Sequence, residues 1–433
     1  MVFSEGKSLK FSMPDMLFVF LVFSSIIPDV GIRFQTAGFN WTGYRLIIAI
    51  TIISIILIIR RLTFNKTNPE IKWLVFMTVW AIQGVCGLFL GEYTNIHKGF
   101  IEWLSIFNGL VVIYVMNNNL VTDERRKKTI RMLYYLLNFF VITSFIEILT
   151  GLHWKTSGFV DMGSAISQYS NHHMATGLMY NMNDFSALLT CLSPILICKD
   201  LGKGRVLSMC GIILVNQIND ATTCNLAIVI FGLYYILVIR GGRGLRALIQ
   251  KLVLLFICAW VILILAISGT SFSDKMNFVG ALFRQIKNAQ NSSGSLFARA
   301  MIYKEALLAW KAYGFWGMGP AGFSEYFTQH PSVTKLVNPH ALFIEIITQY
   351  GIIIGGWFVC LLAWMFVRAN RIYNQTIGKR RDEALMVIAF VIIYSITSFA
   401  SSTFIGFSYQ WLLIAIMSSY LYKTDVIGGK AYA

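Results

Sequence analysis

The sequence predicts an all-α, polytopic membrane protein with about twelve transmembrane helices and one large outer loop. Of its 433 residues, 56% are hydrophobic and only 13% are charged, about half the charged fraction of a typical soluble domain. Apolar stretches long enough to cross a bilayer recur along most of the chain. Because backbone polar groups in lipid must pair within their own segment, such stretches predict helices. We therefore expect residues 1–433 to form a single integral membrane domain.

The basic residues predict how the spans are oriented. We expect spans near residues 15–32, 43–59, 73–91, 99–117, 130–150, 183–199, 205–219, 221–239, 247–269, 341–367, 384–401 and 404–422. Basic residues gather in alternate connecting segments, such as 125–131 and 379–381, so the positive-inside rule places both termini in the cytoplasm. No small-residue cleavage site follows the first apolar run, which predicts a retained first helix. Most of the formal net charge of +16 is then explained by the basic residues that orient the spans, and it does not indicate nucleic-acid binding.

Two segments on the predicted outer side are long, residues 151–182 and 270–340. Loops of this length are usually functional or partly structured. The second segment contains a helical stripe that predicts an amphipathic helix on the outer membrane surface or against the helix bundle. The residues of this stripe are Leu296, Ala300, Tyr303, Leu307 and Trp310.

The segment 270–340 also carries an excess of positive charge. Its seven basic and three acidic residues are Lys275, Arg284, Lys287, Arg299, Lys304, Lys311 and Lys335 against Asp274, Glu305 and Glu325, a net +4. Either an anionic ligand or anionic lipid head groups would explain this excess. The glycine-rich run 314–323 follows the predicted helix. Glycine lets a backbone approach a ligand or another helix closely, so Gly317 and Gly319 are candidate substrate-binding positions.

The stretch Asn338-Pro339-His340 ends this loop, and an apolar run follows it. Asn338 suits an N-cap and Pro339 the first helical position, which places His340 in the first turn. The helix dipole disfavours a positive charge there, so the imidazole is expected to stay neutral and to accept a proton. The alternative is a polar residue that marks a membrane boundary. Glu345 lies within the predicted span, where an ionisable residue is a functional candidate by default.

The sequence lacks the motifs of nucleotide-dependent and metal-dependent chemistry. No GxxxxGKS/T, strand-preceded GxGxxG, HExxH or Asp-x-Asp-like motif is present. The seven cysteines form no CxxC pair, so neither a zinc site nor a disulfide framework is predicted. We therefore expect no metal and no cofactor. A reaction at the outer face needs a substrate that is already activated and already in the membrane, and a lipid-linked diphosphate meets both conditions.

Three blocks within residues 177–351 resemble the bacterial superfamily of O-antigen ligases and polysaccharide polymerases, which are integral membrane glycosyltransferases. The first, Gly177 through Asn183-Asp184-Phe-Ser-Ala, is similar to the family's Gly…Asn-Asp-Phe-Ala pattern. The second, 299–322, resembles the family's arginine, amphipathic helix and Gly-x-Gly-x-x-x-Phe turn. The third, 338–351, is similar to its His-Asn-x9-Gly signature.

The resemblance implies a metal-independent transfer of a glycan from an undecaprenyl-diphosphate donor to an acceptor hydroxyl. His340 is expected to deprotonate that hydroxyl, and Arg299 to pair with the diphosphate and stabilise the leaving group. Two departures stand out. Ala341 replaces the Asn, Ser or Gln that usually follows the histidine, and the helix predicted to start near 219–223 lacks the Ser-Arg pair that many members carry.

Four further positions are candidate substrate contacts with structural alternatives. Arg45, at the outer end of the second predicted span, is either a second phosphate contact or an interfacial anchor that snorkels. Asn183 and Asp184 either bind substrate or cap a helix. Glu345 is expected to support the site rather than to react, because on a helix it projects well round from His340.

The acceptor separates the alternatives within the family. A polymerase in the bacterial cytoplasmic membrane lengthens O-antigen, capsule or exopolysaccharide repeats, with lipid-linked glycans as donor and acceptor and a possible chain-length regulator as partner. A ligase transfers the glycan to lipid A core or to a protein. We favour the polymerase, because both departures fit the ligase branch poorly. A polysaccharide flippase or other membrane transporter is the alternative from another class, although the chain shows no internal repeat.

Overall fold

The computed structural model describes most of the chain, and the account below concerns the described residues alone. These are residues 13–27, 33–36, 39–58, 69–93, 95–154, 173–239, 294–331, 338–339, 341–399 and 405–422. The predicted span at 247–269 and the candidate base His340 lie outside them.

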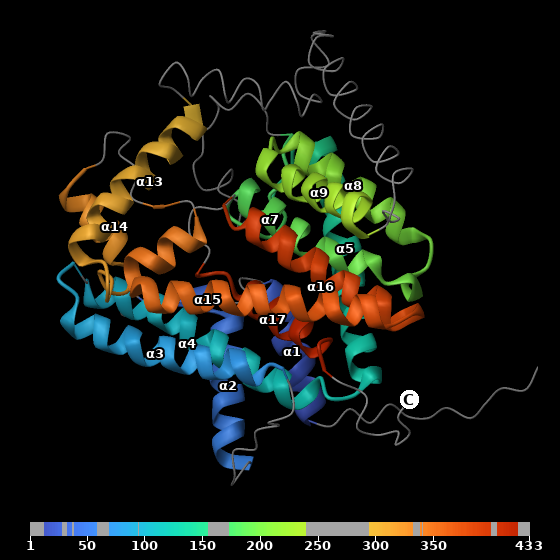
Figure 1. Cartoon of the computed structure of the whole chain (residues 1–433), viewed down its shortest axis with the longest axis horizontal. Helices are drawn as coiled ribbons and strands as arrows, with labels where there is room; N and C mark the ends of the chain where they lie inside the picture. The colour runs from blue at the N-terminus through green and yellow to red at the C-terminus, as the bar shows by residue number, and fades with distance from the viewer. Residues whose placement is uncertain are drawn as a thin grey trace, which may run out of the picture.

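The described part of the chain is built from helices and one short β-hairpin (Figure 1). The α-helices are α1 Met13–Ile26, α2 Gly43–Ile58, α3 Ile71–Leu90, α4 Ile96–Asn119, α5 Asp123–Thr150, α7 Met182–Leu192, α8 Gly204–Ile218, α9 Thr222–Tyr234, α13 Gly294–Tyr313, α14 Gly322–Gln329, α15 Leu342–Gln375, α16 Gly378–Thr397 and α17 Ser408–Ser419. Short 3₁₀ segments η2 (Ser193–Ile197) and η3 (Lys199–Leu201) follow α7, and the π-helix η4 (Tyr235–Ile239) extends α9. Strands β1 (Arg33–Thr36) and β2 (Phe39–Thr42) pair antiparallel, with Phe34 opposite Trp41. The predicted all-α class is confirmed apart from this hairpin.

Among the described residues, five helical segments are long and apolar enough to cross a membrane. They are α3, α4, α5, α9 with η4, and α15. Shorter apolar helices lie at most of the other predicted spans, including α1, α2, α7 and α8. The chain is therefore a multi-pass membrane protein, while the number of about twelve spans remains a prediction from the sequence.

The core of the bundle is formed by α16 and α17. Every residue of α17 is buried, and α16 is buried almost continuously from Glu383 to Thr397. α16 packs against α7, α9, α15 and η2, and α17 packs against α4. A helix that is apolar on all sides is stable only when other helices surround it, and these two occupy that position in Figure 1.

Local sequence signals set several helix ends. The side chain of Asn95 accepts hydrogen bonds from the backbone N–H groups of His97 and Lys98 and caps α4. Thr122 caps α5 in the same way, and Gly151 ends that helix in the left-handed conformation (φ 70°). Short polar side chains satisfy the free N–H groups of a first turn, and glycine adopts a positive φ at low cost.

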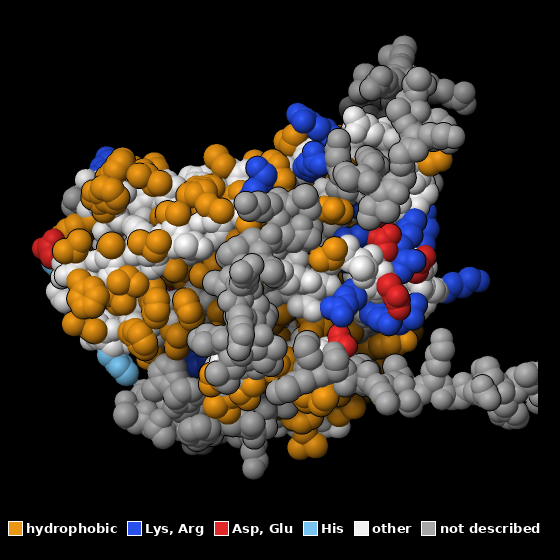
Figure 2. All heavy atoms as spheres, turned by 90° about the horizontal axis from the view of Figure 1, so that it is seen from below, with side chains coloured by type: hydrophobic (Ala, Val, Ile, Leu, Met, Phe, Trp, Pro, Cys, Tyr) orange, Lys and Arg blue, Asp and Glu red, His pale blue; other side chains and the backbone are white. Residues whose placement is uncertain are grey.

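Charged residues gather at one end of the molecule, which we call the charged end (Figure 2). It comprises residues 123–131 of α5, 199–205, 378–383 of α16 and 420–422. Ion pairs join these segments, as between Lys199 and Asp382 (3.0 Å). All of these segments are predicted to be cytoplasmic, and the fold brings them together. α13, α14 and the first part of α15 lie at the opposite end (Figure 1).

A helix is present at the predicted place as α13, but the predicted stripe is not the face that packs against the rest of the described protein. The buried side chains are Ile302, Ala306 and Ala309, whereas Leu307 is 49% exposed. Ile302 and Ala306 form a small separate core with Phe323 and Phe327 of α14. The face of α13 that is buried is the one that packs against α14, and the sequence of α13 alone does not show which face this is.

Candidate functional site

The start of α15 differs from the prediction. The predicted N-cap and first helical position at 338–339 are wrong, because the helix begins at Leu342 after an extended Ala341 (φ −160°). The N–H of Leu342 donates to the carbonyl of Ser398 (3.2 Å). The end of α16 therefore satisfies a backbone group that a capping side chain would otherwise pair with. In the sequence, His340 precedes the first helical residue by two positions and does not belong to the first turn.

Arg299 is held beside this helix start. Its Nη1 donates to the carbonyl of Phe399 (2.9 Å), the residue that follows Ser398. Two consecutive carbonyls at the end of α16 thus hold Arg299 of α13 and Leu342 of α15. This arrangement brings together two of the three sequence blocks that carry the family resemblance.

The charge of Arg299 is available for a ligand. The side chain is half-buried, and no carboxylate of the described residues lies within ion-pair distance of it. A guanidinium has five N–H donors in a planar fork, and among the described residues Arg299 forms one hydrogen bond, to Phe399. A partly desolvated cation with uncommitted donors is suited to bind a phosphate group by two parallel bonds.

The first block, which contains Asp184, is related to this region through Cys224 of α9. Cys224 lies in the first turn of α9 and is fully buried. The charges of Arg299 and Asp184 both act on its sulfur. Asp184 is half-buried in the first turn of α7. Arg299 and Asp184 are therefore both within electrostatic range of Cys224, which relates the first block to the other two.

The segment 173–180, which leads into α7, is fixed by buried polar contacts. Asn219 at the end of α8 donates to the carbonyl of Ala175 (2.8 Å) and accepts from its N–H (2.9 Å). The carboxylate of Glu147 accepts from the N–H of Thr176 (2.8 Å) and contacts His153 (3.2 Å). These contacts hold the approach to Asp184 in one conformation.

Gly177 and its neighbour in space show why the first block contains a glycine. Gly177 has φ +53°, and a Cβ there would lie 2.3 Å from the ring of Phe185. Both residues belong to the first block, and their close contact explains why a glycine occurs together with this phenylalanine. The N-cap of α7 is Asn181, whose side chain accepts from the N–H of Asn183 (2.8 Å). Capping is therefore the role of Asn181, and neither Asn183 nor Asp184 is the cap.

The glycine-rich turn packs on a break in α15. Gly351 departs from helical geometry (φ 79°, ψ 174°), so α15 is two helices across a kink. The N–H of Met318 donates to the carbonyl of Thr348 and that of Gly319 to Gln349, both at 2.9 Å. A Cβ on Gly317 would lie 2.4 Å from the carbonyl oxygen of Gln349. Gly317 and Gly319 therefore permit a close approach to another helix; their predicted contact with substrate remains a prediction.

Two side chains that the sequence reasoning missed hold this turn. Gln83 of α3 donates to the carbonyls of Trp316 and Tyr350, both at 2.8 Å. Glu102 of α4 accepts from the N–H of Ala321 (3.1 Å) and from the hydroxyl of Tyr350. Glu102 is an ionisable residue inside a predicted span, the same signal that marked Glu345.

Comparison with known proteins identifies part of this end of the molecule. Residues 218–359 match the family model described as O-antigen ligase. The match covers less than half of the chain, and we call residues 218–359 the matched region. The match supports the resemblance to the superfamily of O-antigen ligases and polymerases that the sequence motifs indicate. No curated protein matches the chain.

The matched region contains most of the site. It spans α9, α13, α14 and the first part of α15, and so includes Arg299, the glycine-rich turn, His340 and Gly351. Glu345 also lies in it and is buried, with 3% of its surface exposed. Asp184 precedes the matched region in sequence, and its charge and that of Arg299 both act on Cys224.

Arg45 also lies outside the matched region. It is half-buried at the start of α2, where its N–H donates to the hydroxyl of Thr42 (3.3 Å). α2 packs mainly on α1, α4 and β2 and projects from the body of the molecule in Figure 1. The structure shows no contact that joins Arg45 to Arg299, and its role as a second phosphate contact remains a prediction.

Among the described residues, no group of three or more His, Cys, Asp or Glu side chains is placed to hold a metal ion. The positive charge near the start of α15 comes from Arg299. The arrangement can therefore bind an anionic group through an arginine, next to the helix that follows the candidate base.

Proposed function

We propose that this protein is a membrane glycosyltransferase that polymerises undecaprenyl-diphosphate-linked oligosaccharide repeats at the outer face of the bacterial cytoplasmic membrane. The observation that carries the proposal is the half-buried guanidinium of Arg299, which has no described carboxylate partner and lies beside the start of α15. The match to the O-antigen ligase family supports a lipid-linked glycan as substrate.

The proposed reaction is a substitution at the anomeric carbon of the donor glycan. His340 takes the proton of an acceptor hydroxyl, whose oxygen then attacks that carbon. The bond from the anomeric carbon to the diphosphate breaks as the new glycosidic bond forms, and undecaprenyl diphosphate leaves. Arg299 stabilises the negative charge on the departing diphosphate. Positioned proton transfer of this kind accelerates reactions by roughly 10²- to 10⁴-fold.

The charged end supports the proposed orientation of the protein. The basic residues at 125–131, 199–205 and 379–381 gather there, and the positive-inside rule assigns that end to the cytoplasm. Arg299 and the start of α15 then face outward, where nucleotide-linked sugars are absent and lipid-linked donors are present. A metal-independent reaction fits this location.

The second candidate is an O-antigen ligase, which the description of the matched family favours. The acceptor distinguishes the two. Purified protein should be incubated with a lipid-linked repeat unit, with and without lipid A core. A polymerase produces a ladder of longer lipid-linked chains from the repeat unit alone. A product that forms only when lipid A core is added would instead support the ligase, and no product under either condition would refute the glycosyltransferase.

A further inference from the structure

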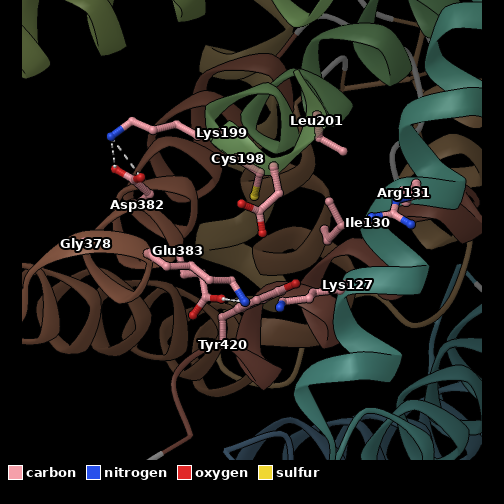
Figure 3. A pocket seen from close by; sticks show the side chains of 12 residues that line it. Lys127, Ile130, Arg131, Cys198, Lys199, Leu201, Gly378, Asp382, Glu383 and Tyr420 are labelled. Atoms are coloured by element: carbon pink, nitrogen blue, oxygen red, sulfur yellow. Dashed lines mark hydrogen bonds and ion pairs between the residues drawn. The ribbon is translucent and has the colours of Figure 1, made fainter. Parts of the chain in front are cut away.

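The charged end contains a cavity of about 300 Å³. It is lined by the N-terminal part of α5, by η3, by the first turn of α16 and by Tyr420 after α17 (Figure 3). This volume is at the lower end of the range for small-molecule sites, roughly 300–1,000 Å³. The cavity lies at the opposite end of the molecule from Arg299, so it is separate from the candidate glycosyltransferase site.

The basic run on α5 divides into residues with and without acidic partners. Arg125 pairs with Asp15, Arg126 with Asp123 and Lys128 with Glu124. Lys127 and Arg131 have no ion pair with a carboxylate of the described residues, and these two line the cavity. They are four residues apart, so they share one face of the helix, and Figure 3 shows both extending toward the cavity.

Three carboxylates also line the cavity, and two of them are neutralised. Asp382 pairs with Lys199 (3.0 Å). Glu383 pairs with Lys379 and Arg380, both at 3.3 Å. Asp200 is exposed at the rim. The four bases that line the cavity, Lys127, Arg131, Lys199 and Lys379, against these three acids leave a net charge of +1.

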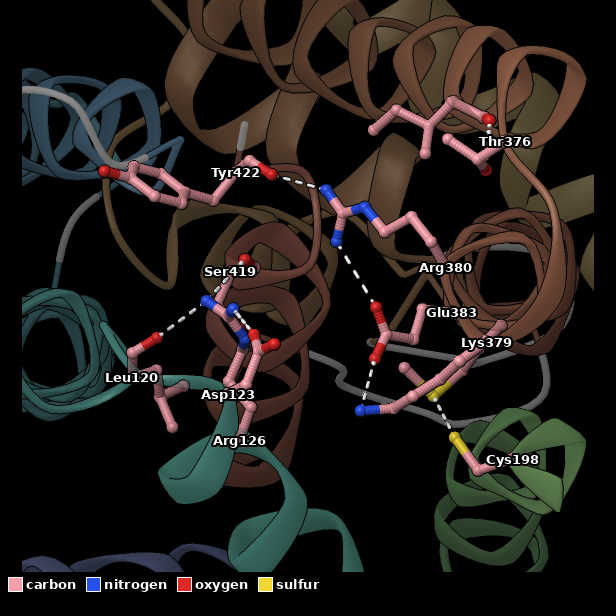
Figure 4. A network of polar contacts seen from close by, with 12 residues as sticks. Leu120, Asp123, Arg126, Cys198, Thr376, Lys379, Arg380, Glu383, Ser419 and Tyr422 are labelled. Atoms are coloured by element: carbon pink, nitrogen blue, oxygen red, sulfur yellow. Dashed lines mark hydrogen bonds and ion pairs between the residues drawn. The ribbon is translucent and has the colours of Figure 1, made fainter. Parts of the chain in front are cut away.

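Hydrogen bonds join the elements around the cavity, and part of its lining is apolar. Arg380 also donates to the carbonyl of Tyr422, and Arg126 donates to the carbonyls of Leu120 (3.1 Å) and Ser419 (3.4 Å) (Figure 4). These bonds tie α5, α16 and the end of α17 together. The remaining lining includes Ile130, Leu201 and Tyr420. A ligand that fits must therefore combine an anionic group with an apolar part.

We propose that this cavity binds the phosphate of an anionic phospholipid from the leaflet at the charged end, with Lys127 and Arg131 as its principal contacts. The cavity lies where the charged first turns of α5 give way to its apolar, membrane-spanning part, so a lipid phosphate reaches it directly. Basic pockets between transmembrane helices bind anionic head groups by the same physics. A lipid that links α5, η3 and α16 would brace the bundle.

The test uses the full-length protein, delipidated in detergent and titrated with phosphatidylglycerol in native mass spectrometry. The cavity variant is Lys127→Gln/Arg131→Gln. The matched control is Lys128→Gln/Arg371→Gln, which removes two charges from exposed positions that do not line the cavity. The substituted residues of both variants are exposed, and their unfolding temperatures are checked against the wild type. No glycosyltransferase activity is needed, so the outcome does not depend on the proposed function.

The wild type should bind phosphatidylglycerol in preference to phosphatidylcholine, and the cavity variant should lose about tenfold or more in affinity, because each basic residue near an anionic lipid contributes on the order of 1 kcal/mol. The control should stay within about twofold of wild type, and each single variant, Lys127→Gln or Arg131→Gln, should lie between. An equal loss in the control would overturn the proposal, since charge alone would then explain binding. Displacement of the lipid by millimolar inorganic phosphate would overturn the assignment to a lipid.

Discussion

Arg299 and Phe399 are joined by a hydrogen bond of 2.9 Å from the guanidinium to the main-chain carbonyl. The bond crosses from α13 to the end of α16, and the preceding carbonyl, that of Ser398, accepts from Leu342 at the start of α15. The position of the arginine is thus fixed by the same short segment that fixes the start of the helix after His340. A charge positioned in this way can bind a diphosphate without first reorganising.

Replacing Arg299 with lysine should impair use of the lipid-linked donor even though the charge is kept. Lysine lacks the planar fork that makes two parallel bonds to a phosphate. Loss of one charged hydrogen bond lowers kcat/KM by roughly 10- to 100-fold. The measurement is the rate of chain lengthening at several donor concentrations. Arg371→Lys, at an exposed position near the charged end, is the control and should match the wild type. Full activity of the Arg299 variant would remove this residue from the site.

Gly351→Ala should destabilise the protein by about 2 kcal/mol or more. Gly351 has φ +79°, and a Cβ there would lie 2.2 Å from the carbonyl oxygen of Phe315. The expected result is a lower midpoint of thermal unfolding in detergent. Gly356→Ala in the same helix is the matched control, because that position is exposed and a Cβ there meets nothing within 4 Å. Equal midpoints for the two variants would show that the break in α15 is not needed.

The stability of the protein should fall as pH rises from about 4.5 to 8, through Glu70. This residue is fully buried just before α3, and among the described residues its carboxylate oxygens have no partner from any other residue. Burial raises its pKa from 4.5 to about 8, although the charge of Arg126 opposes the shift. Between these values the folded protein keeps a proton that the unfolded chain has released, so raising the pH favours unfolding.

Thermal unfolding of wild type and Glu70→Gln at pH 5, 7 and 9 measures this effect. The neutral amide cannot ionise, so the variant should show a flatter pH dependence and should gain on the wild type at pH 9. Parallel curves for the two proteins would mean that Glu70 does not titrate in this range.

Glycosyl transfer should continue in excess chelator. The charge stabilisation of the leaving diphosphate is assigned to Arg299, so removal of divalent cations is expected to leave the rate of chain lengthening unchanged. The measurement compares untreated protein with protein treated with EDTA and then assayed in EDTA-containing buffer. A large loss of rate, restored by adding back a divalent cation, would assign that role to a metal.

Much of the fold can be predicted from the sequence, because apolar runs and basic connecting segments carry direct physical signals. The five longest apolar helices, the helix at α13 and the gathering of basic segments at one end all follow from such patterns. The three family blocks also predict that Arg299 and the segment before α15 lie together. Because Arg299 and α15 are far apart in sequence, short-range patterns alone could not have shown that they lie close together.

The remaining features depend on contacts between segments that are distant in sequence. The start of α15 is shifted because Leu342 pairs with a carbonyl of α16, and no local pattern reports that bond. The glycine at 351 breaks the helix because the turn at 315–319 packs on it. Gln83 lies in a predicted span and donates a hydrogen bond to the same turn, and its local sequence does not indicate this role. Tertiary packing decides each of these cases.

The most direct test of the proposed reaction is the rate at which His340→Ala protein lengthens a lipid-linked repeat unit, compared with wild type at saturating donor. His340 directly precedes Ala341, the N-cap of the helix beside Arg299, and is proposed to accept the proton of the acceptor hydroxyl. The rate should fall by roughly 10²- to 10⁴-fold if positioned proton transfer is lost, while the protein keeps its unfolding temperature and still binds donor. Chain lengthening at the wild-type rate would contradict the assignment of His340 as the base.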